Sequence, residues 1–494
     1  MLLRSAISNL RRNLATTASP YSENLQDVVI IGGGPAGLSL LTTLKNSKKT
    51  RHLKCTLIEG GDLSGIREFG DNPPENYTNR VVSLTPRSIL FMQEKIGNWN
   101  YMLQDRIKFY NNMIVYDDPE NSESRISFDS SGSKHGVIAA MCENLNIQSS
   151  LLKKLDELNE SLDEKATILE KTKVINIFNS SEDNLDAHDL NELKTIEGEG
   201  SLDWPTIELS NGEIIRARLL VGADGYNSPV RKYSGIESRG WGYNAFGVVA
   251  TIKLQCEDYR SIAWQRFLTT GPLAILPLTE DNATIVWSST PELSEILLKV
   301  DPEIFPLLIN AAMTLEEVDL NYIYGMLKKD PNDRAVLDEI EWRRSRISFS
   351  DLEEKYPLPV VSVISSSRAR FPLKMSHSDT YVSPRVALIG DAAHTIHPLA
   401  GQGLNMGQSD VASLVDALET GVDRGLDIGS TLVLEKYVSN SWPSNHSLLG
   451  ICDKLHKIFS TDWPPIVFLR GFGMKTLNFA GPVKKLLVKS VSDM

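Results

Sequence analysis

Cysteine is scarce in this sequence, which has four copies: Cys55, Cys142, Cys256 and Cys452. They are far apart and form no C-x-x-C pair. The pattern therefore predicts neither a disulfide framework nor a thiolate zinc site, and it is typical of a reducing compartment. The eight histidines are scattered, with His394 and His397 as the only close pair. No carboxylate or thiol cluster accompanies that pair, so we interpret both as loop residues and expect no metal.

Long apolar runs are absent as well. No stretch reaches the roughly 18 uninterrupted apolar residues of a membrane span, so we expect no spanning helix. An excess of positive charge is also lacking: the formal net charge is −12, which argues against general nucleic-acid binding. What remains is a globular composition, with 41% hydrophobic and 23% charged residues in a chain of 494. Such a chain is long enough for two or three domains.

Acidic residues are missing from positions 1–22, which contain Arg4, Arg11, Arg12 and several Ser and Thr. On a helical wheel the apolar residues of this stretch fall on one side and Arg4 and Arg11 on another. This composition is typical of a mitochondrial transit peptide. A disordered basic tail is the alternative interpretation.

A glycine motif follows the first strongly apolar run. Val28–Ile31 predicts a strand buried on both faces of a parallel sheet, and Gly32, Gly34 and Gly37 follow in G-x-G-x-x-G spacing. We expect a helix from there to about residue 45. In such a unit the glycines allow a tight turn, close approach of a pyrophosphate and helix–strand packing. Glu59, 22 residues after Gly37, has the spacing of the carboxylate that accepts ribose hydroxyls. A glycine-rich turn in an ordinary α/β protein is the alternative.

Two further strand ends carry an acidic residue. The apolar run 219–222 predicts a buried strand that ends on Asp224, before a short helix with Ser228 as its cap. The run 386–389 predicts another, which delivers Asp391 at its carboxyl end, where α/β sheets bind ligands. A glycine-bearing loop from Pro398 to Gly403 then opens a helix over about 404–419. Its free N–H groups suit a negative charge that develops on a bound ring.

Arg80 precedes a helix that we expect over about 87–95. It is a candidate anchor for a phosphate or a flavin edge, because arginine binds anions well; a surface arginine is the alternative.

The remaining stretches predict secondary structure. We expect short strands in 107–129, a helix over 136–158, a strand over 167–178 and a strand–turn–strand over 204–216. We interpret 179–203, which is acidic and polar, as a solvated insertion. Residues 243–290 predict a separate sheet with its aromatic side chains on one side. These aromatics are either core or a pocket lining. Helices follow over 291–350, and strands return over 359–373.

Taken together, these motifs resemble the FAD-dependent aromatic hydroxylases of the p-hydroxybenzoate hydroxylase fold. The resemblance runs from about residue 27 to the end and is weakest over 179–203. Three stretches of the middle sheet, 263–267, 271–278 and 370–373, resemble the ubiquinone-biosynthesis branch of that family, and the transit-like start resembles its mitochondrial members.

The resemblance implies an α/β fold: a Rossmann-like FAD-binding domain, a second β-sheet substrate domain and a C-terminal helical segment. We expect the FAD-binding domain in three parts, 25–106, 136–240 and 384–440. Substrate-domain strands are expected over 107–135, the substrate-binding sheet over 241–383 and the C-terminal helical region over 441–494.

It also implies roles for individual residues. Gly32, Gly34, Gly37, Glu59, Arg80, Asp224, Asp391 and Gly401 would bind FAD, with Asp391 on the ribityl chain. Pro398, Gly403, Leu404 and Asn405 would lie against the isoalloxazine at the catalytic centre. Arg266, Phe267 and Phe371 would bind substrate.

The implied activity is hydroxylation of a polyprenylated phenol by O2 in ubiquinone biosynthesis, at C5 of the ring, through a C4a-hydroperoxyflavin. Ferredoxin with its reductase, or NAD(P)H, would supply electrons. Two alternatives stay open: a flavoprotein reductase or dehydrogenase that does not activate oxygen, and a prenyl-lipid-binding module like the GDP-dissociation inhibitors.

The implied location is the matrix side of the mitochondrial inner membrane, as a peripheral protein within a biosynthetic complex. The acid-free basic segment 466–489 suits an anionic membrane surface or a partner complex. A C-terminal helix packed on the flavin domain is the alternative.

Overall fold

The computed structural model describes residues 24–119, 124–132, 136–179, 204–397 and 401–459, together with 461, 473, 475 and 476. The predicted transit peptide, residues 180–203 of the predicted insertion and Pro398 lie outside the described residues. All but three residues of the basic segment 466–489 do so as well.

A mainly parallel sheet forms the first layer, because its central strands are continuous apolar runs that are buried on both faces. The strand order is β18-β19-β11-β1-β2-β8, and β10 and β9 extend the sheet from β11. The strands are β1 (Leu25–Ile31), β2 (Cys55–Ile58), β8 (Thr167–Leu169), β9 (Val174–Asn179), β10 (Pro205–Leu209), β11 (Ile214–Gly222), β18 (Val382–Ser383) and β19 (Val386–Leu388).

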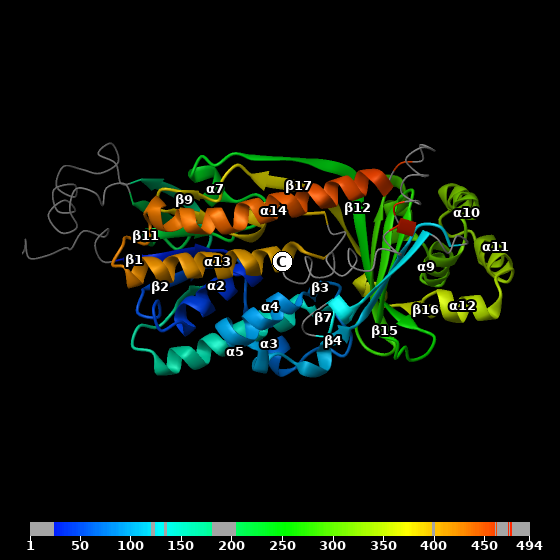
Figure 1. The fold of residues 1–494 in the computed structure, drawn as a ribbon, viewed down its shortest axis with the longest axis horizontal. Helices are drawn as coiled ribbons and strands as arrows, with labels where there is room; N and C mark the ends of the chain where they lie inside the picture. The colour runs from blue at the N-terminus through cyan, green and yellow to red at the C-terminus, as the bar shows by residue number, and fades with distance from the viewer. Residues whose placement is uncertain are drawn as a thin grey trace, which may run out of the picture.

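A row of helices packs beside this sheet in the order α3, α5, α2, α13 and α14, as Figure 1 shows. Its members are α2 (Pro35–Asn46), α3 (Ser64–Asp71), α5 (Asn144–Ser161), α13 (Gly403–Asp423) and α14 (Thr431–Phe459). The short α7 (Pro229–Tyr233) begins where Ser228 caps it by accepting from Arg231 N–H, as predicted. None of the described helices combines the length and apolar content needed to cross a bilayer.

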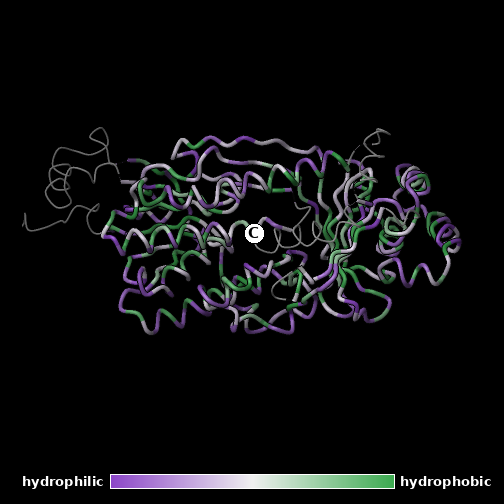
Figure 2. Tube along the Cα trace, in the orientation of Figure 1, coloured by the Kyte–Doolittle hydropathy of each residue, from purple (hydrophilic) through white to green (hydrophobic). Residues whose placement is uncertain are grey.

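The second sheet has nine strands, in the order β20-β17-β12-β15-β14-β13-β5-β6 with β16 beside β12. Hydrophobic residues gather along its strands (Figure 2). The strands are β5 (Asn112–Tyr116), β6 (Arg125–Asp129), β12 (Ser238–Leu254), β13 (Ile262–Leu268), β14 (Gly271–Pro277), β15 (Asn282–Ser289), β16 (Val360–Val363), β17 (Ala369–Ser378) and β20 (His394–Thr395).

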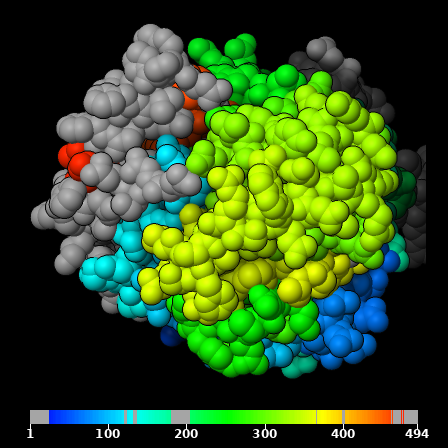
Figure 3. Space-filling view, turned by 90° about the vertical axis from the view of Figure 1, so that its right-hand side faces the viewer, coloured from blue at the N-terminus to red at the C-terminus, as the bar shows by residue number. Residues whose placement is uncertain are grey.

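One face of the second sheet packs on helices that form a core with it, and these helices cover much of the end of the molecule seen in Figure 3. They are α8 (Pro291–Lys299), α9 (Ile304–Thr314), α10 (Glu317–Lys329), α11 (Ala335–Arg344) and α12 (Phe349–Lys355). The first sheet with its helices is one unit of the molecule, and the second sheet with its helices is the other. A third, small sheet, β3-β7-β4, joins the two units; it contains β3 (Val81–Leu84), β4 (Lys108–Tyr110) and β7 (Ala139–Glu143). Helix α4 (Pro86–Phe91) follows β3.

Three long elements connect the first sheet with the second: strands β12 and β17, which belong to the second sheet, and helix α14. Strand β12 has 17 residues and pairs with β17 on either side of a register shift between Gly242 and Phe246, where Asn244 has φ 49°. Helix α14 has 29 residues and reaches from the first sheet to the second (Figure 1). Because these elements are continuous, the two sheets are fixed relative to each other.

Three secondary-structure predictions were wrong. The start of the helix expected over 136–158 is strand β7, because the pairing of β7 with β3 on one side and β4 on the other outweighs the helix propensity of Ala139–Glu143. The single strand expected over 167–178 is two strands, β8 and β9, with Lys171 in a left-handed turn between them at φ 55°. The aromatic residues of the second sheet occupy both faces: Trp264 and Trp287 belong to the core shared with the helices, whereas Phe267 belongs to another cluster.

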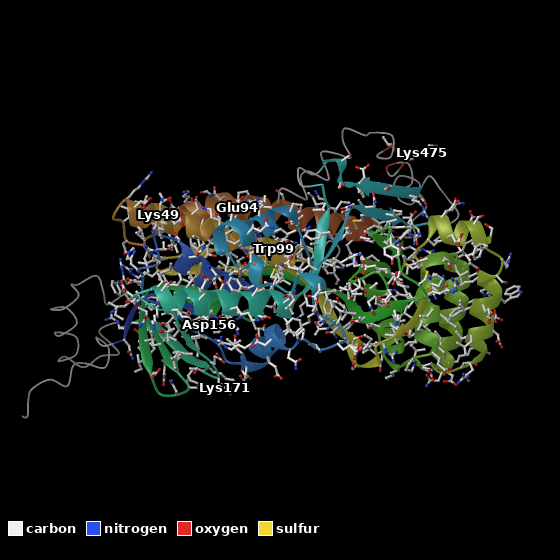
Figure 4. The ribbon with its side chains drawn as sticks, turned by 90° about the horizontal axis from the view of Figure 1, so that it is seen from below. Lys49, Glu94, Trp99, Asp156, Lys171 and Lys475 are labelled. Atoms are coloured by element: carbon white, nitrogen blue, oxygen red, sulfur yellow. The ribbon has the colours of Figure 1, made fainter. Side chains whose placement is uncertain are left out.

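Surface ion pairs contribute little to this fold. Asp156 of α5 accepts from Arg67 at 2.6 Å and Lys171 pairs with Asp62 at 2.9 Å, and all four side chains are more than a third exposed. In Figure 4, Lys171 lies at the edge of the molecule and Asp156 lies on α5, the helix that faces the viewer. Such exposed pairs are worth about 0–1 kcal/mol each. A buried lysine is a different case.

Lys45, at the end of α2, is fully buried, and its Nζ donates to the carbonyls of Arg51 (3.2 Å), Leu53 (2.6 Å) and Glu164 (2.9 Å). Burial lowers the pKa of Lys45. Lys45→Met leaves three carbonyls without their donor, one of them fully buried, and we expect it to lower the free energy of unfolding by roughly 2–4 kcal/mol. Urea unfolding measures the change, and Lys48→Met, at an exposed position of the next turn, is the matched control. Equal stabilities of the two variants would contradict the prediction.

Candidate functional site

Three neighbouring parallel strands bring the three predicted motifs to one edge of the first sheet. Strands β1, β11 and β19 are adjacent and parallel. Just beyond them, Ala223 N–H donates to the Ile31 carbonyl at 2.8 Å, and Ile389 N–H donates to the Gly222 carbonyl at 2.9 Å. The loops that begin at Gly32, Asp224 and Gly390 therefore lie side by side, although they are distant in the sequence.

Two glycines of the first motif are required by backbone contacts. Gly32 has φ 110°, and a Cβ there would lie 2.3 Å from the Ala223 carbonyl oxygen. A Cβ at Gly37 would lie 1.9 Å from the Gly32 carbonyl oxygen. Gly34 differs: a Cβ there would meet nothing within 4 Å. Gly34 stands at the N-terminus of α2, where helix N–H groups bind phosphate well. The open space above Gly34 fits the close approach of a pyrophosphate.

Glu59, at the end of β2, uses its carboxylate to hold this loop. Its Oε2 accepts from Gly33 N–H at 2.5 Å, and its Oε1 accepts from Gly61 N–H at 2.6 Å. The side chain is half-buried. Each carboxylate oxygen has a second lone pair, so Glu59 retains acceptor capacity for a ribose hydroxyl.

Asp224 has one carboxylate oxygen in use and one without a partner. Its Oδ2 accepts from Val230 N–H at 3.2 Å, whereas Oδ1 is buried and has no hydrogen-bond partner among the described residues. Burial raises the pKa of Asp224, against hydrogen bonds from Ser228 and Val230 that lower it. A buried polar atom without a partner at this edge fits contact with a polar ligand.

Asp391 follows β19 in a single turn of 3-10 helix, after Gly390 with φ 58°. Its side chain is accessible to water, but the protein surrounding it desolvates the carboxylate, and this raises the pKa of Asp391. Ala36 of α2 and Gly407 of α13 pack against Gly390. The turn is thus held between two helices with its carboxylate facing outward.

The start of α13 is tied to β3 by Asn405. Asn405 Oδ1 accepts from Thr85 N–H at 3.0 Å and from Ser88 Oγ at 2.8 Å, and Asn405 Nδ2 donates to the Ser83 carbonyl at 2.8 Å. Its side chain is buried and occupied, so any contact of Asn405 with a flavin is through its backbone. Gly403 and Leu404 stand in the first turn, whose N–H groups have no acceptor within the helix.

Two other predicted cofactor residues lie near this helix start. Gly401 has φ 60°, and a Cβ there would lie 3.5 Å from Ser83 Cβ. Arg80, just before β3, is exposed, and its carbonyl accepts from Asn144 N–H. Among the described residues no hydrogen bond or ion pair holds its guanidinium, so Arg80 stays a prediction on chemistry alone. Pro398 lies outside the described residues.

The predicted substrate residues divide between the two faces of the second sheet. Phe267 stacks on Phe459 of α14, with ring centroids 3.9 Å apart. Phe371 packs over Gly247. Arg266, by contrast, is fully buried on the helix side and donates to the carbonyls of Ala312 (2.8 Å) and Asp117 (3.4 Å). This corrects the expectation for Arg266: strand alternation turns its side chain away from the face that carries Phe267.

Sequence reasoning missed several residues near the site. Phe459 is one, since helix α14 gives no local signal of what it will contact. A second group surrounds His397: the rings of Tyr243 and His456 lie 5.0 Å and 4.8 Å from its ring. Burial lowers the pKa of His397 to about 3, so it is neutral. The described residues hold no cluster of His, Cys, Asp or Glu suited to a metal ion.

The glycine geometry gives a matched pair of variants. In Gly34→Ala the new methyl enters open space, so we expect the unfolding free energy without cofactor to change by less than about 0.5 kcal/mol. The same methyl should weaken FAD binding at least tenfold by obstructing the pyrophosphate. Gly37→Ala forces its Cβ onto a backbone oxygen and should destabilise the fold itself by about 2–3 kcal/mol. Urea unfolding and FAD titration separate the two effects. Wild-type FAD affinity in Gly34→Ala would contradict the assignment.

Comparisons with known proteins agree with this geometry. The family described as "FAD binding domain" matches residues 130–425, which identifies FAD as the cofactor. The chain is 46% identical over 489 residues to the mitochondrial ubiquinone biosynthesis monooxygenase COQ6 of Saccharomyces cerevisiae, covering 98% of this chain and 96% of that protein.

Solved structures share the fold. PqsL of Pseudomonas aeruginosa, described as a probable FAD-dependent monooxygenase, superposes with a TM-score of 0.62 at 19% identity, over 91% of this chain and 99% of that one. HpxO of Klebsiella pneumoniae, solved with FAD and uric acid, gives a TM-score of 0.60 at 14% identity, over 94% and 96%. The expected p-hydroxybenzoate hydroxylase fold is therefore confirmed. By its family match and its full-length relatives, the chain belongs to the ubiquinone biosynthesis monooxygenases, within the family of FAD-binding domains.

Proposed function

We propose that this chain is a mitochondrial FAD-dependent monooxygenase that hydroxylates the ring of a polyprenylated phenol in ubiquinone biosynthesis. The observation that carries the proposal is the meeting of three loops at one sheet edge. There Gly34 leaves open space, one buried oxygen of Asp224 has no partner among the described residues, and Asp391 is accessible to water. The name of the yeast relative supplies the pathway and the compartment.

The residues at this edge would hold FAD in a defined order. Gly32, Gly34 and Gly37 would leave room for the pyrophosphate at the start of α2, and Glu59 would accept ribose hydroxyls. Asp224 would lie near the pyrophosphate, and Asp391 would accept hydroxyls of the ribityl chain. When bound, FAD supplies the redox chemistry that activates O2. The protein's own contribution is positioning and electrostatics.

The first turn of α13 would stabilise negative charge on the flavin ring. Its N–H groups at Gly403–Asn405 lie at the positive end of the helix dipole. Asn405 fixes this helix start through Ser83 and Thr85, so the donors are held in place before any ligand binds. Such preorganisation is what makes fixed dipoles effective at a reacting centre.

The face of the second sheet that carries Phe267 and Phe371 would hold the phenol ring and exclude water. Phe459 closes part of this face by stacking on Phe267. For the finer details we propose hydroxylation at C5 of the ring and electrons from ferredoxin with its reductase, or from NAD(P)H. A peripheral position at the matrix side of the inner membrane, within a biosynthetic complex, suits a substrate with a prenyl tail.

The activity is tested with the purified full chain, FAD, a polyprenylated phenol and 18O2. We expect one 18O atom in the ring product, with reduced ferredoxin or NADPH as donor, and the position of the new hydroxyl follows from the product's NMR spectrum. Flavin reduction without ring oxygenation would instead identify a reductase. A colourless folded protein that takes up no FAD would overturn the proposal.

Neighbouring residues on opposite faces of β13 test the substrate face. Phe267→Ala removes a ring from the proposed pocket and should raise KM for the phenol by about tenfold, with FAD content unchanged. Arg266→Met removes donors from two carbonyls on the helix side and should lower stability while KM stays near the wild-type value. Thermal unfolding and steady-state kinetics report both quantities. The reverse pattern would show that the wrong face was chosen.

A further inference from the structure

A buried histidine–aspartate pair lies directly behind the Gly390–Asp391 turn. His394 of β20 and Asp410 of α13 are 1% and 0% exposed, and His394 Nε2 lies 2.6 Å from Asp410 Oδ2. Neither residue is among those that the glycine and aspartate motifs place at the sheet edge. Burial alone would lower the pKa of His394, but the Asp410 carboxylate outweighs it and raises that pKa. The pair is therefore electrostatically coupled.

Both oxygens of Asp410 are in use. Besides His394, Asp410 Oδ2 accepts from Gly390 N–H at 3.0 Å, and Asp410 Oδ1 accepts from Asn445 Nδ2 at 3.0 Å. One carboxylate thus joins the Gly390 turn, strand β20 and helices α13 and α14. The rings of Tyr381 and Tyr437 close the surroundings: Tyr381 lies 5.6 Å from the His394 ring, and Tyr437 OH donates to the Leu388 carbonyl at 2.7 Å.

Such a site is costly for the fold. Moving a carboxylate out of water costs several kcal/mol, and hydrophobic residues of similar volume often stabilise a core as well or better. Stability alone is therefore a weak reason for an ionic group at this position. The contact that distinguishes Asp410 from an ordinary core residue is the one to Gly390 N–H, because Gly390 directly precedes Asp391 and holds a left-handed conformation.

We propose that the His394–Asp410 pair is a positioning device for FAD: the Asp410 carboxylate holds the Gly390 turn so that Asp391 is presented to the ribityl hydroxyls. His394 keeps that carboxylate in place through the contact between its Nε2 and Asp410 Oδ2. This inference rests on the proposed contact of Asp391 with FAD. It assigns neither residue a contact with FAD or substrate, and both act through the backbone of the turn.

The test compares FAD affinity and fold stability in the full chain. Asp410→Asn keeps the shape and one acceptor oxygen but removes the charge. We expect its FAD dissociation constant, measured by equilibrium dialysis, to rise at least tenfold, and the 450 nm flavin band to shift toward that of free FAD. Asp416→Asn is the matched control, because Asp416 lies on the same helix and is exposed, and its ion pair among the described residues is with the surface residue Lys436. The FAD affinity of this variant should equal that of the wild type.

His394→Gln provides a second variant if Asp410→Asn fails to fold. It removes the ring that orients Asp410 and should weaken FAD by about threefold or more, and the double variant should be no weaker than Asp410→Asn alone, because the two residues act as a unit. A folded Asp410→Asn with wild-type FAD affinity and spectrum, and only a lower melting temperature, would overturn the inference.

Asp391→Asn separates this inference from the proposal beneath it. If Asp391→Asn weakens FAD and Asp410→Asn does not, the positioning role fails and the FAD placement stands. If Asp391→Asn leaves FAD affinity unchanged, the proposed placement of FAD fails, and the positioning inference fails with it.

Discussion

The hydrogen bonding of β1, β11 and β19 as parallel neighbours is the constraint on which the rest of this structure depends. Parallel strands end at the same edge, so whatever follows each strand meets there. The first strand contributes a glycine turn and a helix start, and the other two each contribute an aspartate. The backbone hydrogen bonds from Ala223 to Ile31 and from Ile389 to Gly222 continue the ladder past the strand ends. These bonds fix the position of each loop along the strand direction, and the strand order fixes which loops are neighbours.

The second unit is coupled to this edge by continuous elements. Strand β12 pairs with β17 on both sides of the register shift, and the end of β17 reaches the loop after β19, where Ser378 N–H donates to the Ala393 carbonyl. Helix α14 packs on α13 near the first sheet before Phe459 stacks on Phe267 of the second. Asn405 adds a third link, since its amide joins α13 to β3. A face that binds a substrate ring and an edge that binds a cofactor are thereby held at one separation. If a flexible linker joined the two domains, part of the binding free energy of substrate and cofactor would be used to bring the domains into that arrangement.

The sequence contained enough to predict the three strand ends, because each is a short apolar run followed by glycine or aspartate, and that signal is local. The sequence did not show which face of the second sheet each side chain occupies. Trp264, Arg266 and Phe267 lie within four residues of one another on β13, and only the register with β5 and β14 decides which side chain turns toward the helices. Strand β7 was mistaken for helix for the same reason: its pairing partners lie far away in the chain. The His394–Asp410 contact spans 16 residues and two elements, so no spacing rule could have found it.

Three aspartates near the sheet edge show how environment divides one residue type into separate roles. Asp410 is fully buried with every oxygen occupied, and it can therefore only hold protein groups in place. Asp224 has one occupied oxygen and one buried oxygen without a described partner, and Asp391 is accessible to water. Acceptor capacity thus increases from the interior toward the edge. A ligand with hydroxyl groups gains most at the outer two, whereas the innermost carboxylate fixes the turn that carries Asp391. The same side chain serves as support or as binding group according to how many of its lone pairs the fold has already used.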